Sequence, residues 1–319
     1  MNNKSQLNNN LYKHIEIIDD RTDTNSLGHL FLENAFSDFD RLYEIKNKIP
    51  VKTQIKQLFN NTVSDAKTSD TIVLQLRSLI FNELFVNVNW ASYFHLRFNT
   101  YRKNNKIYYP ISTVDTTINF NLVFRYSKRR LIKNARKVFA QEILNSFSTN
   151  SDTSLAYSQY EISKIDSIEK SYLPLYYKKQ LEDGIYLNYE SFKSQQPDKL
   201  FHIDSSENGE IKELFEIDAD GNLKKIKIKK IYALVSNGKA FISSYKKLIP
   251  ISKVNDDYFF TNKVFISTSD NEFITKYDSL SKRAINFISF KDLASLNKRT
   301  FLLKIDHLNG SFIKMEQKK

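Results

Sequence analysis

The sequence predicts an α+β protein with a small antiparallel or mixed sheet and packed helices at the N-terminal side. The C-terminal side is expected to be a mostly antiparallel β domain. The length of 319 residues favours two domains rather than one. Helix-spaced apolar residues mix with alternating segments in the first half, whereas short β segments alternate with turns in the second. Hydrophobic residues make up 41% and aromatic residues 13%, which is enough for packed cores.

We predict four segments along the chain. Residues 1–10 are polar and asparagine-rich and are expected to be a disordered lead-in without the apolar stretch of a signal peptide. Residues 11–150 form the N-terminal α+β domain, 151–183 a helical linker, and 184–319 a mainly β domain. The boundary after residue 150 is indicated by the polar stretch 148–154. The boundary at Gly184 is indicated by a change to short β segments that alternate with turns.

The first elements are two short strands and a helix. Residues 14–18 and 28–32 are β-prone and are separated by a polar turn. Pro50 is suited to the first turn of a helix. The apolar residues that follow have the spacing of an amphipathic helix: Val51, Ile55, Leu58 and Phe59.

A run of strands is expected next. Residues 71–85 fit a buried central strand, although a helix remains open for their second half. Residues 90–101 alternate and predict a half-buried antiparallel strand with His95, Arg97 and Asn99 on one side. A hairpin turn at Asn104-Asn105 leads to residues 107–124, read as one or two strands broken near Pro110.

Two helices follow, and the second domain is built of short strands. The helix over 128–147 has an apolar stripe that includes Ala135 and Ile143, and another helical stretch covers 157–169. Pro174 should interrupt the regular structure that follows this helical stretch. The remaining predicted elements are strands at 185–187, 200–204, 211–217, 223–235, 240–243, 248–251, 258–260 and 264–267, helices at 189–196 and 276–284, and a last hairpin around His307–Gly310.

The composition excludes several classes of active site. The absence of cysteine excludes disulfide scaffolds, thiolate zinc sites and cysteine nucleophiles. The chain has six glycines, and the closest two, Gly209 and Gly221, are 12 residues apart. The glycine-rich loops of dinucleotide-binding proteins, P-loop enzymes and kinases are therefore absent. No cofactor is expected, and no residue is singled out as catalytic.

No metal site is predicted either. None of the five histidines lies at a ligand spacing from another, so a site would need residues that converge from distant segments. The stretches that start at Asp204 and Asp218 resemble calcium loops, but Phe215 and Lys229 stand where the last carboxylate should be. We interpret both stretches as β-turns.

One basic cluster stands out in a chain whose formal net charge is +12. On a helix, part of the cluster shares one face that is able to contact phosphates or anionic headgroups. The alternative is the solvated side of an amphipathic helix, with the overall charge reflecting an AT-rich genome. The cluster consists of Arg125, Lys128, Arg129, Arg130, Lys133, Arg136 and Lys137.

Four motifs together resemble a family of secreted or envelope proteins from Bacteroidetes-type bacteria. The resemblance covers nearly the whole chain and implies an exported protein; it lends no catalytic residue. The motifs are Ile15–Thr24 with Leu27-Gly28, Gly184–Phe192 with Pro197, Tyr232–Lys239, and Leu303–Gly310.

The leading hypothesis is a non-catalytic envelope or secreted protein that serves as a binding or scaffold module for a protein or surface partner. One alternative function is a hydrolase whose catalytic residues are scattered in the sequence. The other is a binder of nucleic acid or anionic surfaces through residues 125–137, with nucleic acid the less favoured partner. A cytoplasmic location also stays open. No membrane-spanning segment is expected, because no apolar run reaches about 18 residues. The sequence does not define the oligomeric state.

Overall fold

The computed structural model describes residues 11–21, 23–31, 42–62, 69–86, 89–122, 127–205, 211–244, 247–265, 274–275 and 298–315. The chain divides into two compact units, and the division falls between Lys164 and Ile165. This point lies inside the stretch 151–183 that was predicted as a linker. Both units combine helices with strands, which confirms the predicted α+β class.

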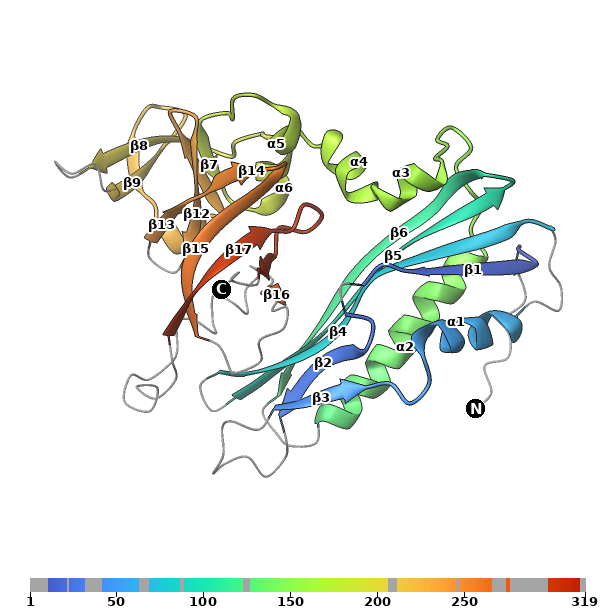
Figure 1. Cartoon of the computed structure of the whole chain (residues 1–319). Helices are drawn as coiled ribbons and strands as arrows, with labels where there is room; N and C mark the ends of the chain where they lie inside the picture. Colours follow the sequence, from blue (N-terminus) through green and yellow to red (C-terminus); the bar gives the residue numbers. More distant parts are fainter. Residues whose placement is uncertain are drawn as a thin grey trace. The chain divides into compact units, whose positions relative to one another are not determined.

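A six-stranded mixed sheet forms the centre of the N-terminal unit, with the strand order β3-β2-β4-β5-β6 (Figure 1). β1 also pairs with β4, and both β1 and β2 run parallel to it, while the other pairs are antiparallel. The strands are β1 His14–Asp19, β2 Ser26–Phe31, β3 Leu42–Lys46, β4 Thr71–Val86, β5 Asn89–Asn104 and β6 Ile107–Leu122.

Helices α1, Val51–Asn60, and α2, Ser127–Phe147, cover one face of this sheet (Figure 1). As the apolar spacing predicted, Ile55 of α1 and Ala135 of α2 are buried. They pack with Leu74 of β4, Leu96 of β5 and further apolar residues into one hydrophobic cluster. The burial of this face, and not helix propensity alone, explains why the two helices form here.

The antiparallel strand predicted over 90–101 is confirmed by β5, but the prediction that it is half-buried was wrong. Between residues 94 and 101 both faces of β5 are buried, and His95, Arg97 and Asn99 are 1%, 7% and 2% exposed. Alternation of polar and apolar residues indicates two different faces, but it does not indicate that the polar face meets water. Here the polar side chains have hydrogen-bond partners inside the sheet, which are Asp115 on β6 for His95 and Arg97 and the Tyr101 hydroxyl for Asn99.

Other boundaries in the N-terminal unit also differ in detail. β4 is a strand throughout, so the helical alternative for its second half was wrong. β6 runs on past Pro110, because Ile111 is accommodated as the extra residue of a bulge. The helix predicted over 157–169 is interrupted at Lys164 and gives α3, Gln159–Ser163, in the N-terminal unit.

The C-terminal unit contains three small sheets around its own core. Their strand orders are β13-β12-β11-β7, β10-β9-β8 and β14-β15-β17-β18-β16, and all the pairings are antiparallel. The strands are β7 Gly184–Tyr186, β8 Leu200–Ser205, β9 Ile211–Ile217, β10 Leu223–Lys225, β11 Ala233–Ser236, β12 Lys239–Ser244, β13 Lys247–Pro250, β14 Ser252–Val254, β15 Asp257–Phe265, β16 Ile274–Thr275, β17 Lys298–Ile305 and β18 Phe312–Lys314.

The described part of this unit also has three short α-helices: α4 Ile165–Ser171, α5 Pro174–Tyr177 and α6 Tyr189–Ser194. Pro174 starts α5 rather than only interrupting the chain, since proline is tolerated at a first helical position. The core is rich in aromatic residues, among them Tyr186, Phe192, Tyr232 and Phe312.

The single strand predicted over 223–235 was wrong. The chain leaves the sheet after β10, makes one 3₁₀ turn at Ile228–Lys230 and enters another sheet as β11. The Ser243 hydroxyl holds this break by donating to the Ile228 carbonyl. Conversely, the strand predicted at 258–260 and the described part of the strand predicted at 264–267 belong to one strand, β15. The helix predicted at 276–284 lies outside the described residues.

Candidate functional site

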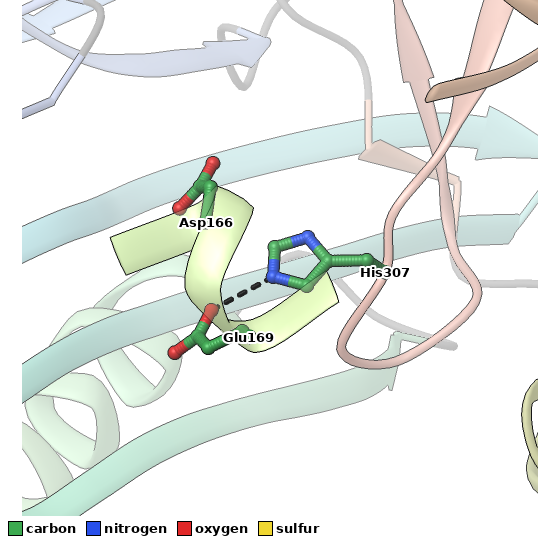
Figure 2. Close-up of side chains that lie close together, drawn as sticks. All are labelled: Asp166, Glu169 and His307. Atoms are coloured by element: carbon green, nitrogen blue, oxygen red, sulfur yellow. Dashed lines mark hydrogen bonds and ion pairs between the residues drawn. The ribbon is translucent and has the colours of Figure 1, made fainter. Parts of the chain in front are cut away.

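Three side chains with metal-binding atoms converge in the C-terminal unit. Asp166 and Glu169 lie three residues apart on α4, and His307 lies in the turn between β17 and β18 (Figure 2). One ligand atom from each residue lies within 4.8 Å of the others. Glu169 Oε2 and His307 Nε2 are hydrogen-bonded at 2.7 Å.

The turn that carries His307 is braced by two buried tyrosines. The Tyr189 hydroxyl donates to the His307 carbonyl at 2.8 Å, and the Tyr232 hydroxyl donates to the Gly310 carbonyl at 2.9 Å. Within the turn, the backbone N–H of Gly310 donates to the carbonyl of Asp306. Several buried partners therefore hold the backbone of the turn that carries His307.

Exposure differs across the three side chains. His307 is buried, Glu169 is partly buried and Asp166 is exposed. The cluster is therefore open on the side of Asp166 and closed behind His307. The neighbouring ammonium of Lys170 is engaged elsewhere, by Asp257 at 2.6 Å.

Sequence analysis did not find this cluster, because His307 is 138 residues away from Glu169 along the chain. Only one local signal was present, namely two carboxylates at i and i+3 of a helix, and such pairs are common on solvated helix faces. No histidine lies at a ligand spacing from another in the sequence, and a metal site would need residues from distant segments. His307 meets two carboxylates of such a distant segment, α4.

A second polar cluster lies in the middle of the N-terminal sheet. Ser78 Oγ is 2.9 Å from His95 Nδ1, and His95 Nε2 is 2.7 Å from Asp115 Oδ1. Arg97 donates two hydrogen bonds to the same carboxylate, both at 3.1 Å. Burial opposes ionisation of Asp115, but the hydrogen bonds and charges of His95 and Arg97 outweigh it and hold its pKa well below the usual range.

This arrangement has the residue types of a Ser-His-Asp triad but differs in two respects. In such a triad the carboxylate compensates the positive charge that forms on the imidazole. Here the guanidinium of Arg97 already neutralises Asp115. In addition, the serine faces Nδ1 of the imidazole rather than Nε2. The geometry fits a polar bridge between β4, β5 and β6.

The predicted basic cluster lies at the start of α2. Arg125 lies outside the described residues, as do the side chains of Lys128 and Arg129. The other four members, Arg130, Lys133, Arg136 and Lys137, are exposed, on the opposite side of the helix from the buried Leu131 and Ala135.

Helix α1 adds Lys52 and Lys56, which are exposed and lie one turn apart. Sequence analysis did not connect them with α2, because nothing local showed that the two helices cover the same face of one sheet. Together the two helices present six described, exposed cations, and Glu142 is the one acidic residue in their sequences.

The loop that starts at Asp218 is a turn, as interpreted from the sequence. Asp218 Oδ1 accepts hydrogen bonds from the backbone N–H groups of Asp220 and Asn222, which lowers the pKa of the Asp218 carboxyl. The carboxylate is thus occupied by its own loop. Most of the loop after Asp204 lies outside the described residues.

No family model matches the chain, and no curated protein matches it. The resemblance to envelope proteins therefore remains an expectation. One similar solved structure is a minor lipoprotein from Acinetobacter baumannii, with 12% identity, covering 44% of this chain and 97% of that one. Its TM-score is 0.27, at which the likeness supports no statement about fold or function. Among the described residues, no helix is long and apolar enough to cross a membrane.

Proposed function

We propose that this protein is a non-catalytic binding module of the cell envelope that docks on anionic lipid headgroups through its N-terminal unit. The observation that carries the proposal is the layer of exposed cations on α1 and α2, which we call the basic layer. It consists of Lys52, Lys56, Arg130, Lys133, Arg136 and Lys137.

The basic layer is held on a rigid support. Its helices are fixed to the sheet by a continuous apolar core, so the long cationic side chains extend from an ordered surface. Each Lys or Arg near an anionic membrane contributes about 1 kcal/mol at physiological ionic strength. Six such residues are sufficient for reversible attachment without a membrane-spanning segment.

Two features favour lipid headgroups over nucleic acid as the source of phosphate. None of the six residues is accompanied on its helix by an exposed aromatic side chain that would stack on a base. Ile49, which directly precedes the N-cap of α1, is 45% exposed and offers an aliphatic side chain next to the cations. A membrane interface accepts such a residue, whereas a phosphate backbone does not.

The test is co-sedimentation of the full chain with vesicles of phosphatidylcholine, with and without 30% phosphatidylglycerol. We expect binding only to the anionic vesicles, and a steep loss of binding with salt, since screening shortens the range of the charges. The variant Lys133→Glu/Lys137→Glu should lower the affinity at least about 30-fold, because each reversal removes an attraction of about 1 kcal/mol and adds repulsion.

The matched control is Lys239→Glu/Lys247→Glu, which changes the net charge equally at two exposed lysines of the C-terminal unit. This variant should bind nearly as the wild type does. An equal loss in both variants would mean that overall charge, and not the basic layer, governs binding. Tighter binding to duplex DNA than to anionic vesicles at equal phosphate concentration would overturn the choice of lipid.

A second candidate function is hydrolysis, favoured by one observation, the chain of hydrogen bonds from Ser78 through His95 to Asp115. The neutralisation of Asp115 by Arg97 makes it the weaker candidate. A screen with p-nitrophenyl esters tests it directly. Turnover that disappears in Ser78→Ala would support hydrolysis, and the absence of turnover in the wild type would remove the candidate.

A further inference from the structure

The cluster of Asp166, Glu169 and His307 has no role in the basic layer, and it belongs to the other unit of the chain. It combines one imidazole and two carboxylates, a donor set typical of borderline divalent metal ions. Three protein ligands, with water as the fourth, make up the usual coordination of an accessible zinc ion. We propose that these three residues bind one divalent ion of the zinc class.

The distances require only small movements for such an ion to bind. Ligands of a tetrahedral zinc ion lie about 3.3 Å from one another, given metal–ligand bonds of about 2.0–2.1 Å. The Glu169–His307 contact of 2.7 Å must therefore open slightly. No separation in the cluster exceeds 4.8 Å, so none must close by more than about 1.5 Å. Asp166 is exposed, so its side chain can make this adjustment by rotation.

The electrostatics of the cluster also favour a cation. Two carboxylates three residues apart on a helix repel one another. A divalent ion between the carboxylates would replace this repulsion by attraction.

The turn that carries His307 is held in place by hydrogen bonds from behind, which favours a metal ligand at this position. Metal-binding side chains are commonly held in orientation by a second layer of hydrogen bonds. Here the turn backbone is held by the hydroxyls of Tyr189 and Tyr232, both buried. Gly310 allows this packing, since a Cβ atom there would lie 2.1 Å from Cγ of Tyr189. The imidazole is thus presented at a fixed place facing α4 (Figure 2).

The competing interpretation is an ion pair that attaches α4 to the β17–β18 turn and binds no metal. The two interpretations make different predictions for Asp166, which lies outside the Glu169–His307 hydrogen bond. If the cluster is only an ion pair, Asp166→Asn leaves zinc binding unchanged. If it is a metal site, Asp166→Asn removes one of three ligands and weakens binding.

The experiment is calorimetric titration of the full chain with zinc chloride after treatment with a chelator. We expect one ion per chain with a micromolar or lower dissociation constant, and a rise in melting temperature on binding. Asp166→Asn and His307→Gln should each weaken binding at least about 10-fold, as loss of a ligand does. Replacement of zinc by cobalt should give visible absorption bands that both variants lose.

The matched control is His202→Gln, at an exposed histidine that is paired with Asp204 at 3.1 Å and belongs to no three-ligand group among the described residues. Its zinc affinity should equal that of the wild type. Because His307 is buried, His307→Gln can impair folding, whereas exposed Asp166→Asn should keep the wild-type circular dichroism spectrum. A wild type that binds zinc only at millimolar concentration, or an Asp166→Asn variant with unchanged affinity, would overturn the proposal.

Discussion

The carboxylate of Asp115 on β6 accepts a hydrogen bond from His95 on β5 at 2.7 Å, inside the sheet of the N-terminal unit. The same carboxylate binds the guanidinium of Arg97. His95 and Arg97 are both buried, so Asp115 compensates the charge of a buried guanidinium and accepts a hydrogen bond from a buried imidazole. We expect this acid to be a major determinant of the stability of the sheet.

Asp115→Asn should lower the free energy of unfolding by about 2–3 kcal/mol, since removing one partner of a buried ion pair leaves an uncompensated charge. The value is at the lower end for such changes, because the Asp115 side chain keeps 16% exposure. Urea unfolding measures it. As a control, Lys103→Gln, which breaks the more exposed pair with Glu16, should cost less than about 1 kcal/mol.

The contribution of Asp115 should also depend on pH. Its pKa is lower in the folded chain than the unfolded value of 3.8. The folded state therefore favours the ionised form, and the stabilisation is complete above the unfolded pKa and is lost as the pH falls below it. The gap in unfolding free energy between wild type and Asp115→Asn should shrink as the pH falls below about 4, because Asp115 is then protonated in the unfolded chain before it is in the folded one. A constant gap down to pH 3 would contradict this origin.

Gly310→Ala should destabilise the C-terminal unit more than Gly221→Ala. Both glycines have positive φ angles, +69° and +81°, so each substitution incurs backbone strain of about 1–2 kcal/mol. Only at Gly310 would the new methyl group collide with Tyr189; at Gly221 nothing lies within 4 Å. We expect an additional loss of about 1–3 kcal/mol for Gly310→Ala from this overpacking. Equal melting temperatures for the two variants would show that the Tyr189 contact is unimportant.

The elements of the N-terminal unit were largely predictable because their signals are local. The spacing of Val51, Ile55 and Phe59 predicted α1, and all three residues are buried. The strand over 223–235 was mispredicted for the opposite reason. Its residues are β-prone throughout, and the break at Ile228 depends on a hydrogen bond from Ser243, which a local pattern does not contain.

The candidate sites show the same limit. The four described members of the predicted cluster on α2 are exposed, because helical periodicity alone places them opposite Leu131 and Ala135. The neighbouring lysines of α1 and the approach of His307 to Glu169 result from tertiary packing. No spacing along the sequence encodes either of them.

Gln75→Leu should weaken the attachment of α3 to the sheet. The buried amide of Gln75 donates to the Asp20 carboxylate at 2.6 Å and to the Ile162 carbonyl at 2.8 Å, and it accepts from the Tyr101 hydroxyl at 3.0 Å. Leucine has a similar size but satisfies none of these partners. Because unpaired buried polar groups cost about 1–3 kcal/mol each, we expect a loss of about 2–4 kcal/mol in unfolding free energy.

Hydrogen exchange tests whether this loss acts through α3. Gln75 bonds the carbonyl of Ile162, the buried residue of α3, so the α3 amides should exchange faster in Gln75→Leu than in the wild type. Gln57→Leu, at an exposed position of α1, is the control and should change stability by less than about 0.5 kcal/mol. If α3 kept its wild-type exchange rates while the whole chain lost stability, the amide of Gln75 would stabilise the sheet and not the attachment of α3. The short helix would then be held by its apolar contact through Ile162 and by the capping box of Ser158 and Glu161.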